Sequence, residues 1–145
     1  MVDRDEIARL IPHAGTMCLI DRVASWDEKK IICETSSHKA ADNPLRANGM
    51  MGAACGVEYA AQAMAIHGGL TQAAGSKRPK GGFLVSLRSL TLNLRRLDVL
   101  AGDLTIEAER LAGEESRVSY AFSLTCDGAA VLSGRAAVLL DMEAT

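Results

Sequence analysis

The stretch "GVEYAAQAMAIHG" (residues 56–68) places one carboxylate, Glu58, among alanine, methionine and other small or apolar residues. Its length and composition predict a buried helix from about residue 51 to residue 67, ended by the two glycines at 68–69. On such a helix Gln62 lies one turn after Glu58, on the same face. The stretch therefore predicts an acid held in a partly dry place, beside an amide that can orient it.

The residues before this helix predict a short first helix and two strands. Residues 3–11 carry apolar side chains at helical spacing, and a proline follows them. Residues 17–27 and 30–37 indicate two strands joined by a tight polar turn. The polar stretch 38–48 predicts a loop between the second strand and the helix.

The residues after the helix begin with a polar stretch, 75–82, which predicts a second loop. Beyond it, apolar and polar side chains alternate as they do in half-buried strands. The alternation changes phase near Arg88 and Ser89, which predicts a β-bulge or a sharp bend. The expected strands are residues 83–95, 104–111, 118–126 and 129–140.

Only one helix in this order is long and apolar enough to cover a sheet. A curved antiparallel sheet wrapped round that single long central helix buries both elements. The predicted fold class is therefore α+β, with hotdog architecture. The length of 145 residues suits one core, so we expect a single hotdog domain over residues 1–145.

The net charge of −2 argues against a nucleic-acid partner, because such proteins carry a strongly basic surface. The start of the chain, "MVDRDEIARL", lacks the apolar run of a secretory signal. The best membrane-spanning candidate, residues 49–66, contains Glu58 and Gln62, which favours a buried helix instead. We therefore expect a cytoplasmic protein with no membrane partner.

The four cysteines are Cys18, Cys33, Cys55 and Cys126, and no two of them form a Cys-x-x-Cys pair. Each sits among apolar neighbours. Free, reduced and buried thiols are the expectation for such cysteines in a cytoplasmic protein. The sequence shows no spacing typical of metal ligands, and we expect no metal site.

Two motifs resemble one known family. The motif "LIPHAGTMCLIDRV" (residues 10–23) resembles the opening motif of the β-hydroxyacyl-acyl-carrier-protein dehydratases of the hotdog superfamily. The motif "GVEYAAQAMA" (residues 56–65) resembles the helix of that family, in which a glutamine follows a glutamate after four residues. The helix is most similar to a divergent branch of small dehydratase-like proteins, including those of aryl-polyene biosynthesis clusters.

This resemblance implies loss of water from a 3-hydroxyacyl thioester, giving a trans-2-enoyl thioester in fatty-acid or polyene-type synthesis. It implies no cofactor, a dimer, and acyl carrier protein or coenzyme A as the carrier of the substrate. In the relatives a glutamate on the central helix and a histidine of the other subunit serve as acid and base. The family's histidine lies fourteen residues before the glutamate; this chain has Pro44 there, and no histidine between Lys39 and Ile66.

Glu58 is the first candidate for catalysis. Its neighbours on the same helix face are alanines, which leave space for a substrate and keep water away. Burial disfavours the charged form of a carboxylic acid, so a half-dry glutamate can hold or give a proton near neutral pH. Gln62 is predicted to orient Glu58 and to contact the substrate. The alternative is a structural glutamate satisfied by Arg22, Arg46 or a backbone amide.

The three histidines receive three different interpretations. His13 follows a proline in a short loop and is the best candidate for the catalytic partner of Glu58, since elimination needs both a base and an acid; ordering that loop is the alternative. His38 opens the loop where the family histidine is missing, and we predict a substrate-binding role for it. His67 ends the predicted helix and is interpreted as a cap that suits the helix dipole.

The residues that lead into the helix are candidates for binding a thioester carbonyl. Gly49, Gly52 and Ala53 precede the helix, and free N–H groups at a helix start can polarise a carbonyl oxygen. In the relatives a glycine at this point has that role. Gly52 and Ala53 are therefore predicted to bind substrate, with ordinary loop flexibility as the alternative.

The sequence also contains a concentration of basic residues and an Asp-Arg pair. Acyl carrier proteins are acidic, so a local basic surface would suit docking, although basic loops are also ordinary solvated surface. Asp21 and Arg22 match the Asp-Arg of the family and point to opposite faces of a strand, which indicates a structural role such as an ion pair at a dimer edge. The main basic concentration consists of residues 76–80, Arg88, Arg95 and Arg96.

Two alternatives to dehydration stay open. A hotdog acyl thioesterase uses a helix carboxylate to activate water and needs no histidine. A non-catalytic partner subunit keeps the acyl tunnel or the dimer surface and completes a site on a related chain. We expect a homodimer or higher oligomer, or a heterodimer with another hotdog chain.

Overall fold

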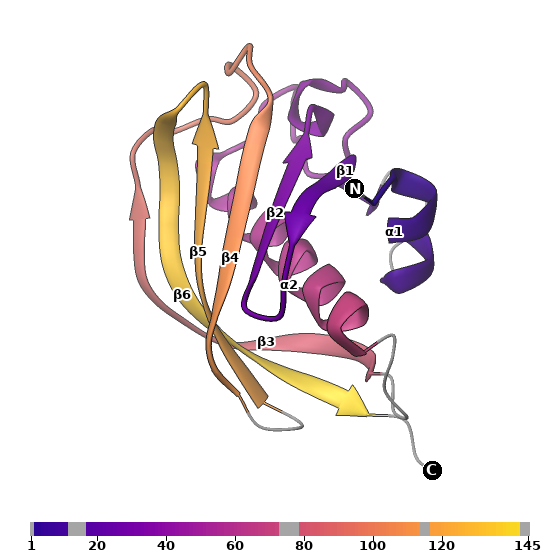
Figure 1. Cartoon of the computed structure of the whole chain (residues 1–145). Helices are drawn as coiled ribbons and strands as arrows, with labels where there is room; N and C mark the ends of the chain where they lie inside the picture. The colour runs from indigo at the N-terminus through magenta and orange to yellow at the C-terminus, as the bar shows by residue number, and fades with distance from the viewer. Residues whose placement is uncertain (1, 12–16, 73–78, 114–116, 143–145) are drawn as a thin grey trace.

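The computed structural model describes residues 2–11, 17–72, 79–113 and 117–142 (Figure 1). Helices and strands follow one another in the predicted order, with two short 3₁₀ turns before the main helix. The elements are α1 (Arg4–Leu10), β1 (Arg22–Trp26), β2 (Lys30–Thr35), η2 (Ser37–Lys39), η3 (Ala53–Cys55), α2 (Gly56–Gln72), β3 (Pro79–Leu92), β4 (Leu104–Gly113), β5 (Arg117–Cys126) and β6 (Ala129–Met142).

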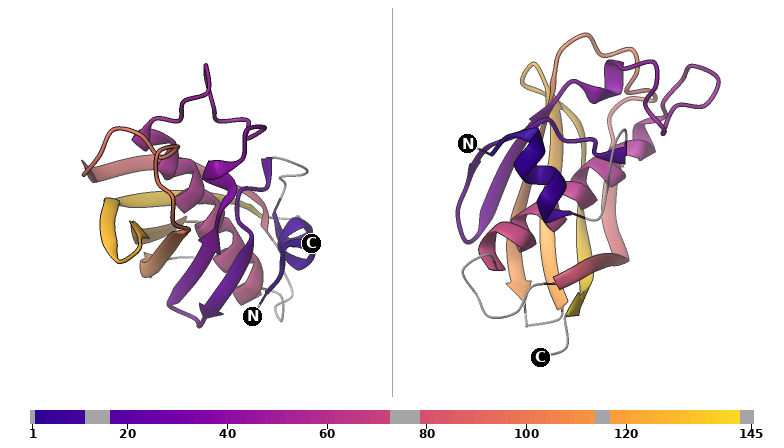
Figure 2. Two further views of the ribbon diagram at one scale, coloured as in Figure 1. Left: turned by 90° about the horizontal axis from the view of Figure 1, so that it is seen from above. Right: turned by 90° about the vertical axis from the view of Figure 1, so that its right-hand side faces the viewer.

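The strands of the described residues form one six-stranded sheet in the order β1-β2-β4-β5-β6-β3. Every neighbouring pair is antiparallel. The sheet curves round α2, which has 17 residues and lies across its concave face (Figure 1). Helix α1 lies on the side of α2 that is turned away from β4 and β5 (Figure 2). The predicted α+β arrangement of a curved antiparallel sheet round one helix is confirmed.

The core forms between one face of α2 and the concave face of the sheet. Alternate residues of β4 and β5 are buried, as the alternation in the sequence predicts. Gly56 opens α2 directly above Leu124 and Leu132, so close that a Cβ at this position would collide with Leu132. Buried members of this core include Tyr59, Ala60, Ala63, Ile66, Leu104, Ile106, Leu124 and Leu132.

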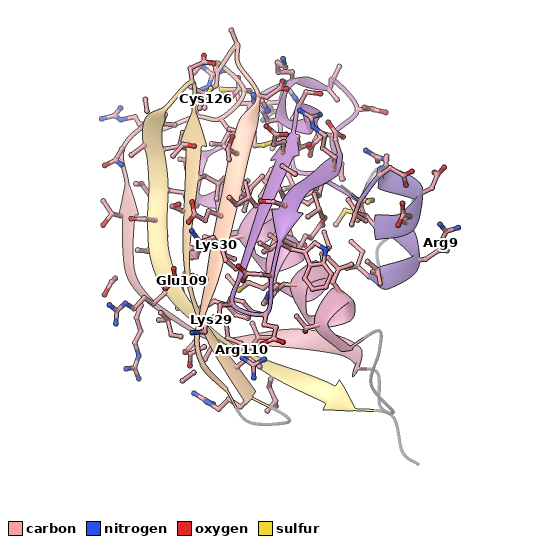
Figure 3. All side chains as sticks on the ribbon, in the orientation of Figure 1. Arg9, Lys29, Lys30, Glu109, Arg110 and Cys126 are labelled. Carbon is pink, nitrogen blue, oxygen red and sulfur yellow. The ribbon has the colours of Figure 1, made fainter. Side chains whose placement is uncertain are left out.

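The opposite face of the sheet is more polar, although apolar residues of the strands such as Leu111 and Leu139 are exposed as well. Lys30 and Glu109 lie on this outer face, on neighbouring strands (Figure 3). The Nζ of Lys30 lies 3.0 Å from a carboxylate oxygen of Glu107, and both side chains are about two-fifths exposed. Such exposed ion pairs contribute little to stability. The sheet is therefore amphipathic, with the apolar side chains turned toward α2.

Several predicted boundaries are wrong. The helix begins at Gly56 rather than near residue 51, after a 3₁₀ turn, and it does not end at residues 68–69 but continues to Gln72. A Cβ at Gly69 would lie 3.3 Å from Leu10, so glycine lets α1 approach closely, and this packing outweighs a propensity cost of about 1 kcal/mol per glycine. Strand β3 includes residues 79–82, which the sequence indicates as loop, because they pair with the end of β6.

Strand β3 ends at Leu92 rather than at residue 95, and the first strand begins at Arg22 rather than at residue 17. The Met17 carbonyl and the Leu19 N–H bond the side chain of Gln62 on α2, as described below. The predicted phase change in β3 is confirmed, because the register shifts between Arg88 and Thr91. Ser89 there adopts a left-handed backbone conformation with φ of 54°.

All four cysteines are free thiols; Cys18, Cys33 and Cys126 are buried and Cys55 is partly buried. Burial raises the pKa of the Cys33 thiol to about 12. This thiol therefore stays protonated near neutral pH and packs as a small apolar side chain. Within residues 2–11, 17–72, 79–113 and 117–142, none of the helices has both the length and the apolarity needed to cross a membrane.

Candidate active site at the start of the central helix

Glu58 lies in the first turns of α2, on the face that is turned away from the sheet. Its side chain is partly buried, and its Oε1 accepts a hydrogen bond from Nε2 of Gln62 at 3.3 Å. Along the same helix face, Ala54 is exposed and Ala61 and Ala65 are partly buried. The four-residue spacing thus brings the acid and the amide together as predicted, on a helix face lined by small side chains.

Gln62 ties Glu58 to the segment before β1. Its Oε1 accepts the Leu19 N–H at 2.9 Å, and its Nε2 also donates to the Met17 carbonyl at 2.8 Å. Both N–H bonds of the amide are therefore used inside the protein, and the side chain is 1% exposed. These contacts give Gln62 a clear positioning role, while direct contact with substrate stays a prediction.

The two arginines that could have neutralised Glu58 bind other groups. Arg22 pairs with Glu34 at 2.9 Å and lies 3.7 Å from Asp103. Arg46 donates to the carbonyls of Gly49 and His38, at 2.7 and 2.9 Å. The proposed structural pairing of Glu58 with Arg22 or Arg46 is therefore wrong.

An open hollow of about 560 Å³ lies between the start of α2 and the end of β3. This volume lies within the usual range for small-molecule pockets. Ala54, four residues before Glu58 and in the 3₁₀ turn that precedes α2, forms part of its wall, while Glu58 itself is not among the lining residues. Its lining residues are Gly52, Ala53, Ala54, Leu92, Asn93, Leu94 and Arg95.

The backbone at the hollow is partly occupied by internal hydrogen bonds. The Ala53 N–H donates to the Arg95 carbonyl at 2.8 Å, so this amide is not a free donor, and the expectation of a free N–H at Ala53 is wrong. The Gly52 N–H has no acceptor among the described residues. Gly49, with φ of 76°, is in a tight turn closed by Ala47 and Met50 and does not line the hollow.

His38 is buried away from this hollow. A carbonyl oxygen only accepts, so the Nε2 of His38 carries the hydrogen that bonds the Leu100 carbonyl at 3.0 Å. Its Nδ1 has no partner among the described residues, and burial lowers the pKa of the ring below its usual value. Its ring has no exposed surface, so a substrate-binding role stays a prediction that requires the loop to rearrange.

His67 is not a helix cap, and that interpretation is wrong. Because α2 continues to Gln72, the ring of His67 turns into the core and has no exposed surface. Its Nε2–H donates to the Asp27 carbonyl and its Nδ1 accepts from the Tyr120 hydroxyl, both at 2.7 Å. Burial lowers the pKa of His67, which keeps the ring neutral in this arrangement.

His13 and residues 76–78 of the basic stretch lie outside the described residues. Arg88 and Arg95 are exposed, as expected for a docking surface. Arg96, by contrast, binds Asp98 through its guanidinium group. Arg96 is therefore assigned a structural role and is removed from the predicted basic surface.

Asp21 and Arg22 point to different partners, as the strand alternation predicts. Asp21 binds Arg4 at 3.1 Å and accepts the Ser36 N–H at 2.8 Å, while Arg22 binds Glu34. The two side chains do not pair with each other. Their contacts support the structural interpretation.

Sequence reasoning missed two polar groups near the site. Asp98 accepts the Met51 N–H at 2.9 Å, just before α2. The Tyr59 hydroxyl is buried between Ser37 at 2.9 Å and Asn43 at 3.1 Å. The partners in each contact are 16 to 47 residues apart in the chain, so no local pattern signals them.

An antiparallel sheet curved round one helix is the arrangement of hotdog-fold proteins. A family model described as "ApeP-like: ApeP dehydratase" matches residues 5–144. This chain therefore belongs to the ApeP-like dehydratase family. No curated protein matches the chain.

Several solved structures share this fold. The dehydratase heterocomplex ApeI:P from Xenorhabdus doucetiae matches with a TM-score of 0.82 and 19% identity, covering 92% of this chain and 90% of that chain. A thioesterase from Haemophilus influenzae matches with a TM-score of 0.66 and 12% identity, covering 97% and 91%. A mutant thioesterase from Pseudomonas aeruginosa matches with a TM-score of 0.62 and 14% identity, covering 97% and 95%. At these identities the likeness concerns the fold alone.

Proposed function

We propose that this protein removes water from a 3-hydroxyacyl thioester and releases a trans-2-enoyl thioester. The observation that carries the proposal is Glu58, held by Gln62 on the open face of α2, one turn from the wall of the hollow. Membership of the ApeP-like dehydratase family supports the same reaction. The carrier is acyl carrier protein, whose acidic surface suits the exposed Arg88 and Arg95, or coenzyme A.

The reaction needs an acid for the leaving hydroxyl and a base for the proton on Cα. Glu58 in its acid form donates its proton to the hydroxyl as the C–O bond breaks, and water leaves. A histidine takes the Cα proton, and the electrons of the C–H bond form the new double bond. The two groups then exchange the proton through solvent, which restores the starting state.

His13 is the proposed base. Gln62 bonds the carbonyl of Met17, four residues after His13 in the sequence, and the amide of Leu19. This link between the helix that carries Glu58 and the segment that follows His13 supports the assignment. The Gly52 N–H is the proposed donor to the thioester oxygen, where negative charge develops as the Cα proton leaves.

The proposed assembly is a dimer, either of two copies or with another hotdog chain. Strand β3 is an edge strand of the described sheet, and an edge presents unpaired backbone groups. Leu87, Leu90 and Leu92 on this strand are 36–44% exposed, which favours a covered surface. The likeness to a dehydratase heterocomplex supports a partner chain. A partner at this edge would adjoin the hollow, because Leu92 lines it.

Thioester hydrolysis is the second candidate, because both imidazoles of the described residues, His38 and His67, are buried and bonded to carbonyl oxygens. Glu58 as a carboxylate would then activate a water molecule that attacks the thioester carbonyl. The third candidate is a non-catalytic subunit that completes a site on a related hotdog chain.

One experiment separates the three functions. The purified full chain is offered a 3-hydroxyacyl thioester of acyl carrier protein, and the acyl product is followed by mass spectrometry. Loss of one water supports dehydration, and release of free acid supports thioesterase action. An unchanged substrate would overturn both catalytic functions for the chain alone and favour the partner-subunit function.

A further inference from the structure

Strand β3 leaves part of its length uncovered on both faces. It is hydrogen-bonded on one side only, to β6, and forms an edge of the described sheet (Figure 1). Residues 87–92 are all exposed. Because neighbouring side chains of a strand point to opposite faces, a run of exposed residues means that neither face is covered there. An uncovered edge that carries Leu87, Leu90 and Leu92 is a surface that a partner chain can bury.

Two arginines lie directly opposite each other at this edge. Arg88 on β3 is the register partner of Arg135 on β6, so their side chains lie on the same face of the sheet. Ala136, the next residue of β6, pairs with Tyr120, whose hydroxyl bonds His67 on α2. Ala136 and Tyr120 therefore face α2, and the two arginines lie on the outer face, where both are exposed.

No carboxylate of the described residues balances these two charges. The ion pairs within the described ranges include neither Arg88 nor Arg135. On its other side, Arg135 is opposite Ala121 of β5, which is neutral. Like charges directly opposite each other in a sheet repel and lower stability. The chain alone thus carries a repulsion at its edge, which a carboxylate from another chain would relieve.

A second copy of this chain brings no suitable carboxylate to the edge. Residues 79–97 contain four basic residues and no aspartate or glutamate. The one acidic residue of β6 is Asp141, whose register partner is Gly81, far along β3 from Arg88. In a two-fold symmetric pairing the same surface meets itself, so arginines would face copies of the same basic strand. Self-pairing therefore adds positive charge where the charge is already unbalanced.

We infer that Arg88 and Arg135 make the β3 edge select a different hotdog chain, one whose edge strand presents a carboxylate on its outer face, over a second copy. The inference rests on the assembly given under the proposed function, which leaves both partners open, and it chooses between them. The exposed leucines and unpaired backbone groups attract either partner. The arginines decide between the two, because charged groups at an interface suppress wrong partners more than they add affinity.

Charge reversal at the edge tests this selection, with the full chain itself as the probe. The variant Arg88→Glu/Arg135→Glu repels its own copies as the wild type does, whereas a mixture of the two sets glutamates against arginines. Sedimentation equilibrium gives the dissociation constants, and native mass spectrometry separates the mixed dimer by mass. The mixed dimer should form about tenfold more tightly than either homodimer. Equal affinities, or a mixture that stays monomeric, would overturn the inference.

Ionic strength gives a second readout. At about 1 M salt the Debye length falls to about 3 Å, so charge interactions across an exposed edge are screened. Self-association of the wild type should strengthen with salt, while the mixed dimer should weaken. Salt effects of the same sign in both cases would show that the arginines do not set the choice of partner.

Arg117→Glu is the matched control, because it makes the same change of charge on β5, two strands away from the β3 edge. Its self-association and its association with wild type should equal those of the wild type alone; a mixed dimer as tight as that of the edge variant would overturn the inference. These measurements need no turnover. An inactive wild-type chain would therefore contradict the proposed reaction and leave the result on partner choice intact.

Discussion

The two halves of helix α2 carry ionisable side chains in opposite settings. Glu58 and His67 are nine residues apart, which is about 13 Å along a helix axis. Glu58 is partly buried on the face turned away from the sheet, one turn from an open hollow. His67 has no exposed surface, and both of its nitrogens are bonded at 2.7 Å.

The difference shows that one half of the helix seals an ionisable ring into the core, while the other half leaves a carboxylate partly accessible. The neutral His67 ring is fully satisfied, so it fixes the β1–β2 turn and β5 onto α2 and has no nitrogen left for a substrate. Glu58 accepts a hydrogen bond from the Gln62 amide and lies where small side chains leave room. In the sequence alone, both residues are ionisable side chains in an otherwise apolar helix, and their different burial is not evident.

The largest expected effect is loss of activity at the open end of the helix. Glu58→Gln keeps the shape of the side chain but cannot donate the proton, so kcat should fall about a thousandfold. The free energy of unfolding should change by less than about 1 kcal/mol, because the side chain is not part of the sealed core. Steady-state kinetics and urea denaturation check the two quantities, and wild-type turnover in this variant would contradict the site.

The next effect is a loss of stability at the closed end. His67→Ala leaves the Tyr120 hydroxyl and the Asp27 carbonyl without their partner and opens a cavity. The free energy of unfolding should fall by about 3 kcal/mol. Activity per folded molecule should stay within about twofold of wild type, since His67 is far from the hollow. A large loss of kcat in the folded variant would mean that His67 is not purely structural and would contradict the proposed difference between the Glu58 and His67 ends of α2.

Gln62 is buried and also bonds Glu58, so its replacement should lower both stability and kcat. Gln62→Ala breaks the bonds to Met17, Leu19 and Glu58, so the free energy of unfolding should fall by about 2 kcal/mol. The loss of orientation at Glu58 should lower kcat about tenfold. Thermal denaturation and kinetics on the same preparation check both values. A purely structural role for Gln62 would lower stability and leave kcat unchanged.

The smallest effect is a dependence of stability on pH. Burial lowers the pKa of both His38 and His67 below the ordinary value of 6.5, so the unfolded chain binds more protons below that pH. The free energy of unfolding should therefore be at its full value above pH 6.5. As the pH falls, it should decrease by at most about 1.4 kcal/mol per pH unit for each histidine.

Urea denaturation between pH 5 and pH 8 measures this slope, and His67→Gln should flatten it. A slope of the opposite sign would mean that the folded protein binds more protons than the unfolded chain. Asp98 acts in a separate range, because its lowered pKa contributes stability above about pH 3.8 that is lost only in stronger acid.

Local patterns were sufficient for the architecture and for half of the candidate site. Alternation along residues 104–111 and 118–126 located β4 and β5, and the spacing of Glu58 and Gln62 located their hydrogen bond. These features depend only on the period of a strand or a helix. The sequence also placed the bulge in β3, since a bulge changes the phase of the alternation.

The remainder depends on contacts between distant parts of the chain. The helix continues past Gly69 because α1 packs there, and no local signal announces that packing. The ring of His67 bonds Tyr120, which is 53 residues further along the chain, and the Met51 N–H bonds Asp98, which is 47 residues further along. The pairing of such groups is fixed by the folded topology, so propensity and spacing do not reveal it.

The first residue of α2 has a consequence for the position of Glu58. Gly56 packs against the side chains of Leu124 and Leu132 so closely that a Cβ would collide with Leu132. Any larger residue would require the Leu132 side chain to move or the first turn of α2 to shift. A shift of that turn would also move Glu58, two positions later, although Glu58 itself had not been changed.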